Sequence, residues 1–552
     1  MIKNGRNADI SAGKAKNATK LFFSGVLVLT VSNIVVKLIG LLFKIPMNHV
    51  VGDTGMGYYT SAYTIYTLLY MISTAGLPVA LSKMVSESRA QGRIKESKRI
   101  FRLSVVLFAI VGFVSMAVMA LTAKWYSTAI IGAPPTYVCI YTIAPTLFFI
   151  CITSAFRGYF QGYQQMIPTA VSQVIESACK LGIGITAAVY AINRGYEIHI
   201  VAAFASVGLT VGVILGTLFL AGYKLFFKPG TYDEEYISVV GESSLCEKNS
   251  ALIARLVRIA VPITLSASVM SLSNLIDAVL VQRLLQSAGM AQEAATTVYG
   301  NYTTLAVPMF NLPAVLVSPV GCSIIPLITV VNERGDRQRA KVIMESALRV
   351  SVIIGLPCAI GLTVLAGPIL NLFYVAQSAE MATPLLMLLA PSSLFVCILT
   401  VTNAILQSNG HERKPLVSML VGGVIKIAVN CLLIGKIGMA ATPISTFVCY
   451  LAATVLNFVF AFRDVGLVPD FRKVFWRPLA AGAVCGASAA IAYRLLSLAL
   501  QAKIATAAAI IIAAVIYFIC VMLFGAVTKD DLDLLPGGGK MVKLLKIFNR
   551  NC

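Results

Sequence analysis

The chain has 552 residues, of which 58% are hydrophobic and 12% are charged, and its formal net charge is +21. Soluble domains carry about 25% charged residues, so this composition excludes an ordinary soluble protein. The positive charge is spread over many short segments between apolar stretches, which favours anionic membrane lipids as partners and excludes a nucleic-acid-binding protein.

Apolar segments long enough to cross a bilayer recur along the whole chain. A transmembrane helix needs about 20 mostly apolar residues, and fourteen segments meet this requirement. The fold class that we predict is therefore an all-α polytopic membrane protein with 14 transmembrane helices. The predicted spans are residues 21–45, 58–82, 103–123, 136–156, 168–192, 198–222, 259–282, 298–328, 350–370, 383–409, 415–435, 438–462, 478–499 and 504–526.

Lysine and arginine alternate strongly between the segments that connect these spans. With the amino terminus in the cytoplasm, 34 of the 44 Lys and Arg residues fall on the cytoplasmic side, six fall outside and four lie within spans. This asymmetry is what the positive-inside rule requires. We therefore predict a multi-pass protein of the bacterial cytoplasmic membrane with both termini in the cytoplasm. The first span shows no small-residue cleavage site, so we expect it to stay as an anchor.

An internal repeat relates the two halves of the chain at a constant offset of 246 residues. Cys151 corresponds to Cys397 at this offset, and Lys180 corresponds to Lys426. Because each copy would hold six spans, both copies would have the same orientation, as in parallel-repeat transporters with a site between the halves. Chance similarity between apolar helices is the alternative.

The repeat predicts two pseudo-symmetric six-helix lobes followed by helices 13 and 14. The predicted limits are a cytoplasmic amino tail at 1–20, an N-lobe at 21–222, a cytoplasmic linker at 223–258, a C-lobe at 259–462, helices 13 and 14 at 463–526, and a cytoplasmic carboxyl tail at 527–552.

Four lysines lie within predicted spans, where a charge is costly and usually faces a cavity or a partner. Lys37 and Lys44 are seven residues apart in the first span and share one helical face. Lys44 is close enough to the outer surface to snorkel there instead. Together with Lys180 and Lys426 they predict a mildly cationic cavity, which suits a phosphate-bearing substrate.

Acidic residues near these lysines leave two interpretations open. Glu176 precedes Lys180 by one turn and can pair with it within the helix. Asp277 in the seventh span either neutralises a cavity lysine, binds a cation, or pairs with Arg283. We predict that Arg157, at the inner end of the fourth span, anchors to lipid head groups.

The remaining residue patterns predict no metal site and no disulfide framework. The chain has 12 cysteines, but the nearest two are 12 residues apart and most lie within spans. The span at 298–328 contains four prolines, so we expect a bent or broken helix there.

Several stretches resemble one known family. Residues 37–87 read KLIGLLFKIPMNHVVGDTGMGYYTSAYTIYTLLYMISTAGLPVALSKMVSE, and residues 307–328, 355–374 and 405–415 (ILQSNGHERKP) agree further. The chain resembles the stage V sporulation protein B-like branch of the polysaccharide-exporter group. That superfamily also holds the lipid II flippases and the multidrug and toxic-compound extruders, and the resemblance covers nearly the whole chain.

The resemblance implies a MATE-like inverted-V pair of lobes around a central cationic cavity, with helices 13 and 14 forming a groove for a lipid tail. It implies export of an undecaprenyl-diphosphate-linked saccharide, with the peptidoglycan precursor lipid II as first candidate. By analogy the helix 1 lysines contact the diphosphate, and the Gly-Asp-x-Gly turn adds Asp53 to the candidate substrate-binding residues.

The resemblance leaves ion coupling open. Some relatives bind sodium between helices 7, 11 and 12, where Asp277 and Asn430 would lie in this chain. Lys426 sits one turn before Asn430, and its ammonium can replace the ion, so coupling to Na⁺ or H⁺ is not required. We expect no resident cofactor and a monomeric protein.

We therefore predict alternating access without covalent chemistry, for growth or for sporulation. A membrane potential of 100 mV contributes about 2.3 kcal/mol per charge that crosses fully, so outward movement of an anionic head group is electrically favoured. The alternatives are a multidrug–cation antiporter, an exporter of another polysaccharide lipid intermediate, and a membrane-embedded glycosyltransferase or polymerase. The enzyme is disfavoured because the chain offers no sizeable outer loop with carboxylates and histidines.

Overall fold

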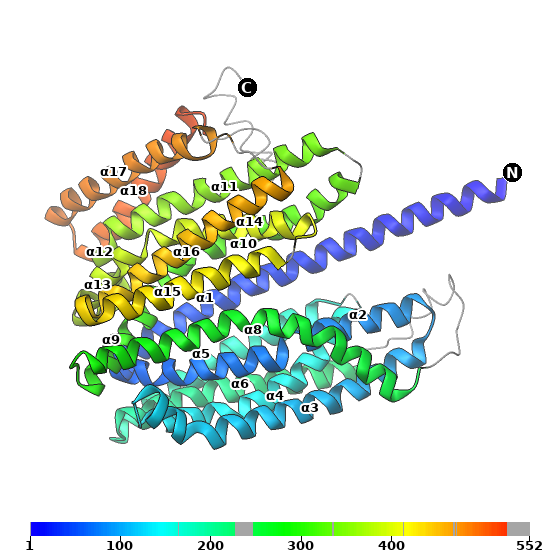
Figure 1. Cartoon of the computed structure of the whole chain (residues 1–552), viewed down its shortest axis with the longest axis horizontal. Helices are drawn as coiled ribbons and strands as arrows, with labels where there is room; N and C mark the ends of the chain where they lie inside the picture. Colours follow the sequence, from blue (N-terminus) through cyan, green and yellow to red (C-terminus); the bar gives the residue numbers. More distant parts are fainter. Residues whose placement is uncertain are drawn as a thin grey trace. The chain divides into compact units, whose positions relative to one another are not determined.

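The computed structural model describes residues 2–163, 165–226, 247–333, 336–411, 413–466, 470 and 472–526. Every regular element within these ranges is a helix (Figure 1). By its internal contacts the chain divides into two compact units, Met1–Ala278 (unit 1) and Val279–Cys552 (unit 2).

Unit 1 is built from long helices that follow one another along the chain. They are α1 (Ile2–Thr74), α2 (Leu77–Ala90), α3 (Ile94–Trp125) with a π-helical end (Tyr126–Ile131), α4 (Thr136–Gly162), α5 (Ile167–Asn193), α6 (Ile198–Phe226) and most of α8 (Asn249–Ser287). Within the unit α4 packs against α3 and α6, and α5 packs against α6 and α1 (Figure 1).

Unit 2 contains the end of α8 and all later helices. They are α9 (Gln292–Asn301), α10 (Val307–Glu333), α11 (Arg337–Val364), α12 (Ala366–Phe373), α13 (Ala376–Leu389), α14 (Ser392–Ser408), α15 (Arg413–Ile437), α16 (Ala441–Phe460), α17 (Arg477–Ala499) and α18 (Ala502–Leu523). Short π- or 3₁₀-helical turns join some of them: Tyr302–Ala306, Gly438–Ala440, Ala461–Val465 and Arg472–Trp476. Within this unit α17 pairs with α18 and also packs against α11.

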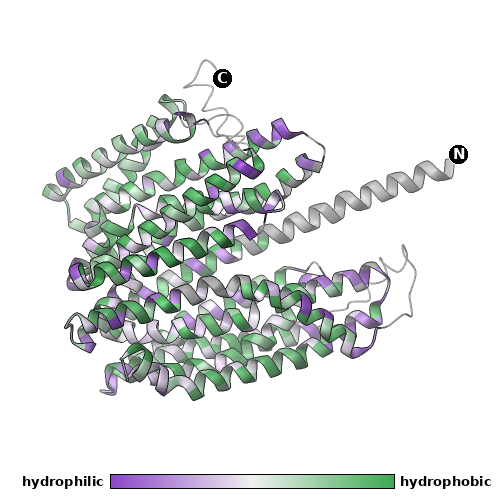
Figure 2. Cartoon of the chain, in the orientation of Figure 1, coloured by the Kyte–Doolittle hydropathy of each residue, from purple (hydrophilic) through white to green (hydrophobic). Residues whose placement is uncertain are grey.

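The helices of the described part are long and apolar enough for a multi-pass membrane protein. Nine stretches qualify as membrane spans, or up to 10 if α13 and α14, which are bent by 49°, form one span. Figure 2 shows apolar residues along the helices and hydrophilic residues concentrated near helix ends. Two of the nine stretches, Val31–Arg89 and Arg413–Val465, contain more than one helix. The all-helical polytopic class is therefore confirmed, and the number 14 stays a prediction.

The long helix α1 reverses direction at Gly52, whose φ is 67°. The rings of Phe43 and Tyr59 lie 5.8 Å apart, although 16 residues of a continuous helix span about 24 Å. The chain must therefore fold back between them, and glycine accepts this positive φ without a steric penalty. The reversal makes two antiparallel segments from α1 and brings the residues on both sides of Gly52 together.

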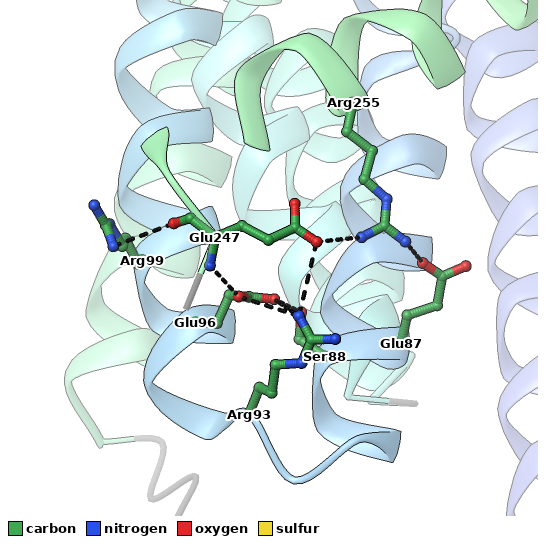
Figure 3. Close-up of polar contacts among 7 residues, drawn as sticks. All are labelled: Glu87, Ser88, Arg93, Glu96, Arg99, Glu247 and Arg255. Carbon is green, nitrogen blue, oxygen red and sulfur yellow. Dashed lines mark hydrogen bonds and ion pairs between the residues drawn. The ribbon is translucent and has the colours of Figure 1, made fainter. Parts of the chain in front are cut away.

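The helix α8 is fastened to unit 1 by a group of ion pairs and hydrogen bonds that we call the α8 anchor. Arg255 of α8 contacts Glu87 of α2 at 2.5 Å and Glu247 at 3.3 Å. Glu96 of α3, which is 1% exposed, accepts a hydrogen bond from the Glu247 backbone N–H at 2.9 Å and from Ser88 at 3.1 Å. Figure 3 shows all members of the anchor: Glu87, Ser88, Arg93, Glu96, Arg99, Glu247 and Arg255.

The internal contacts divide the chain at Ala278, inside α8, whereas the repeat predicted two lobes joined by a linker at 223–258. The predicted lobe limits stay a prediction. Leu252 and Leu256 of the predicted linker and Ala260 of the predicted seventh span pack in a hydrophobic core with α2, α3 and α4. The prediction for residues 227–246 of the linker lies outside the described residues.

Similar contacts occur in the two units, although only one residue of each contact obeys the predicted offset: Thr217 and Thr454 are 237 residues apart, and Gly112 and Gly355 are 243 apart. The Thr217 hydroxyl donates to the Phe149 carbonyl at 3.4 Å in unit 1. In unit 2 the Thr454 hydroxyl donates to the Phe395 carbonyl at 3.3 Å, and Phe149 and Phe395 are 246 residues apart. Close helix approaches at a glycine recur in the same way. A Cβ on Gly112 would lie 2.9 Å from the Cβ of Cys151, and one on Gly355 would lie 3.0 Å from that of Cys397.

Candidate functional site

The half-buried ammonium group of Lys180 on α5 is surrounded by aromatic rings from α1. Its Nζ lies 4.8 Å from the ring centre of Tyr63, 4.9 Å from that of Phe43 and 5.8 Å from that of Tyr59. Among the described residues no carboxylate pairs with it. Each ring contact stabilises a cation by about 0.5–2 kcal/mol and leaves its charge uncancelled, so the site remains attractive to an anion.

The reversal at Gly52 and the packing of α5 on α1 bring two of the predicted lysines together. Lys44 is half-buried and directly follows Phe43, whose ring centre lies 4.9 Å from the Nζ of Lys180. A phosphate group bound beside both lysines would gain charge-assisted contacts. We call Lys44, Lys180 and the three rings the lysine site.

The acid predicted as a partner for Lys180 is bound elsewhere. The Oε1 of Glu176 accepts a hydrogen bond from Nη2 of Arg157 on α4 at 2.7 Å. The same guanidinium donates to the Ser172 hydroxyl through Nε at 3.1 Å and Nη2 at 3.0 Å. The prediction that Arg157 anchors to lipid head groups was wrong, because Arg157 is only 8% exposed and is held inside the helix bundle.

The helices α5 and α6 cross closely beside Lys180. A Cβ on Gly208 of α6 would lie 2.4 Å from the backbone nitrogen of Gly184 and 3.0 Å from the carbonyl oxygen of Lys180. A Cβ on Gly212 would likewise lie 2.6 Å from the carbonyl oxygen of Glu176. Only glycine at these places lets the two backbones approach so closely.

A row of tyrosines continues from the lysine site along α1, and it was missed in the sequence. The rings of Tyr59 and Tyr63 lie 5.8 Å apart, those of Tyr63 and Tyr66 5.4 Å, and those of Tyr66 and Tyr70 5.9 Å. Their spacing of four, three and four residues is typical of one helical face. That spacing would have revealed the row, but tyrosine inside an apolar span was counted as hydrophobic.

The other predicted site residues lie elsewhere on α1, on α8 or in unit 2. Lys37 is exposed on α1, and Asp53 accepts a hydrogen bond from the Asn48 side chain at 2.7 Å. Asp277 is half-buried on α8 in unit 1.

In unit 2, α15 carries the half-buried Lys426 and the fully buried Asn430. Their membership of one common site with unit 1 stays a prediction, as do the roles of Lys37, Asp53 and Asp277. In the described part of the chain, His, Cys, Asp and Glu form no group of three that could hold a metal ion.

The chain is similar to known membrane proteins over most of its length. The family model described as "Polysaccharide biosynthesis protein" matches residues 22–332, and the model described as "MatE" matches residues 262–432. Stage V sporulation protein B of Bacillus subtilis (strain 168) is 23% identical over 527 residues, which cover 95% of this chain and 99% of that protein. Lipid II flippase MurJ of the same organism is 25% identical over 462 residues, which cover 80% and 82%.

A solved structure has the same fold. Lipid II flippase MurJ in an inward closed conformation matches with a TM-score of 0.68 and 12% sequence identity, over 90% of this chain and 98% of that chain. At this identity the likeness concerns the fold alone. Together with the family models it confirms the resemblance inferred from the sequence, including the MATE-like fold.

Proposed function

This chain belongs to the family described as polysaccharide biosynthesis protein and is related to transporters rather than enzymes, and we propose that it moves a polyprenyl-diphosphate-linked saccharide across the membrane. The observation that carries the proposal is the lysine site, where Lys180 is held by aromatic rings and its neighbouring acid is bound to Arg157. A cation that is desolvated in this way favours a multiply charged anion such as a diphosphate.

Lipid II is the specific substrate that we propose. The support is the similarity to lipid II flippase MurJ of Bacillus subtilis (strain 168) over 82% of that protein. In the proposed mechanism the diphosphate binds Lys44 and Lys180 while the polyprenyl tail stays in lipid, and a change between inward-open and outward-open states carries the head group across. Lys37 and Lys426 are proposed as further contacts, and the potential favours outward movement of a dianion.

The test is complementation of a bacterial strain depleted of its lipid II flippase, scored by the outward accessibility of labelled lipid II. We expect the wild-type chain to restore accessibility, and Lys180→Gln to reduce it about tenfold or more, because a charge-assisted contact contributes about 1.5–3 kcal/mol. Lys503→Gln, at an exposed lysine of α18, is the matched control and should act like wild type. Equal activity of Lys180→Gln at equal membrane abundance would show that this lysine does not bind the substrate.

A multidrug–cation antiporter is the second candidate, and the match of the MatE family model to residues 262–432 favours it. A lipophilic cation would be repelled by the ammonium group of Lys180, and the only acid on α5, Glu176, is bound to Arg157. Drug resistance that rises with expression of the chain, without any effect on lipid II, would favour this candidate over the proposed one.

A further inference from the structure

The two copies of the internal repeat carry different polar side chains at one equivalent position. Arg157 in unit 1 corresponds to Asn403 in unit 2 at the offset of 246 residues. Arg157 donates to Glu176 at 2.7 Å, whereas Asn403 accepts from the Asn457 side chain at 2.7 Å. The ion pair of unit 1 joins α4 to α5, whereas the neutral amide pair of unit 2 joins α14 to α16.

The helix α14 therefore packs without a charged side chain at the position equivalent to Arg157. The side chains of Arg157 and Glu176 are only 10% and 14% exposed, and burying two charges is unfavourable enough that neutral replacements of such pairs are often equally stable. Ionised groups within membrane helices usually have a function for the same reason. The presence of this pair beside the lysine site therefore needs an explanation other than stability.

We propose that Arg157 is a positioning residue, which keeps Glu176 away from Lys180 so that the lysine remains available to the anionic substrate. This inference rests on the proposed function. Glu176 lies four residues before Lys180 on α5, a spacing at which a carboxylate and an ammonium can pair directly. Without Arg157 the carboxylate would turn to Lys180 and cancel the charge that binds the diphosphate.

The orientation of the guanidinium fits this role. Ser172, one turn before Glu176 on α5, accepts hydrogen bonds from Nε and Nη2 of Arg157. The guanidinium is therefore fixed against α5 at two successive turns and holds the carboxylate on the side of α4. The pair acts on the lysine only through Glu176, because the described contacts include none between Arg157 and Lys180.

The second copy carries no acid at the equivalent position. Glu176 corresponds to Gly422, one turn before Lys426. Glycine has no carboxylate, and the space beside it is filled by Cys449 of α16, whose carbonyl oxygen would lie 2.8 Å from a Cβ there. In unit 1 the acid one turn before the lysine is therefore bound by Arg157, and in unit 2 no acid stands one turn before the lysine.

The experiment measures binding of farnesyl diphosphate, a short prenyl diphosphate, to the purified full-length protein by thermal shift. Farnesol, which lacks the phosphates, should give no shift, and inorganic pyrophosphate, which lacks the chain, should bind more weakly. We expect Arg157→Gln to weaken farnesyl diphosphate binding about tenfold or more. The double variant Arg157→Gln/Glu176→Gln should recover affinity to within a few fold of wild type, and Glu176→Gln alone should bind at least as tightly as wild type.

Two results would overturn the inference. One is an unchanged affinity of Arg157→Gln for farnesyl diphosphate, even if its unfolding temperature is lowered. That result would show that the pair of Arg157 and Glu176 has only a structural role. The other is a double variant as weak as Arg157→Gln. If Arg157→Gln does not fold, Ser172→Ala loosens the guanidinium while retaining the ion pair, and it should weaken binding severalfold, with unchanged affinity counting against the inference.

The reference variant Lys180→Gln separates this inference from the proposed function. If Lys180→Gln abolishes the shift and Arg157→Gln does not, only the positioning role fails. If farnesol matches farnesyl diphosphate, or if Lys180→Gln binds farnesyl diphosphate like wild type, the lysine site itself is not an anion site and the proposed function fails with it.

Discussion

Substitution of Gly208 by alanine tests whether α5 and α6 pack as closely as described. The new methyl would lie 2.4 Å from the backbone nitrogen of Gly184, whereas ordinary contacts are 3.4–4 Å. The two backbones must therefore separate by about 1 Å, since neither can rotate away as a side chain does. Overpacking of this kind costs about 1–3 kcal/mol, and a clash with backbone belongs at the upper end. The better helix propensity of alanine offsets about 1 kcal/mol, so we expect a net loss of about 2 kcal/mol.

The assay is thermal or SDS-induced unfolding of the purified protein, with Gly182→Ala as the matched control. Gly182 lies on α5 as well, but a Cβ there has nothing within 4 Å, so this variant should be neutral or up to about 1 kcal/mol more stable. Gly208→Ala should also weaken farnesyl diphosphate binding, because its methyl displaces the turn of α5 that carries Lys180. Equal stability of the two variants would refute the close crossing.

Two further predictions concern the α8 anchor and the amide pair of unit 2. Glu96→Ala should destabilise the protein by about 2 kcal/mol, since it leaves a buried N–H and a charged group without their partner. The side chain of Arg255 is 39% exposed, so Arg255→Ala should destabilise the protein by less than about 1 kcal/mol. This smaller effect should disappear at high salt. The measurement is the unfolding of both variants at low and high salt. A larger loss of stability in Arg255→Ala than in Glu96→Ala would contradict these contacts. Asn457→Leu should lower the free energy of unfolding by about 0.6–1.7 kcal/mol, the range for hydrogen bonds between membrane helices. It should leave the affinity for farnesyl diphosphate unchanged. Weakened binding would show that the amide pair of unit 2 also affects the lysine site.

The sequence was sufficient for the fold class because length and hydropathy alone decide whether a helix can span a bilayer. The correspondence of Lys180 and Lys426 in the repeat could also be predicted, because a charged residue inside an apolar span is easily recognised. The partner of Glu176 was not predictable, since spacing along a helix identifies only neighbours on that helix. Which of two cations it binds depends on how α4 approaches α5, and that approach is set by packing.

The α8 anchor could not be predicted from the sequence for a related reason. It joins groups that are far apart in the chain, such as the Glu247 N–H and Glu96, which are 151 residues apart. No periodicity links such positions. The tyrosine row, in contrast, was readable from its spacing and was overlooked because its members were counted only for their contribution to hydropathy.

The reversal at Gly52 also bears on the order in which the protein is made. Phe43, Tyr59 and Tyr63 all belong to one hairpin, so the ring surfaces can come together as soon as the ribosome has released that hairpin. Lys180 emerges 117 residues after Tyr63, on the order of ten seconds later at usual translation rates. The aromatic rings that contact Lys180 can therefore be in place before Lys180 is synthesised. Its ammonium group then finds favourable neighbours as soon as α5 inserts into the membrane.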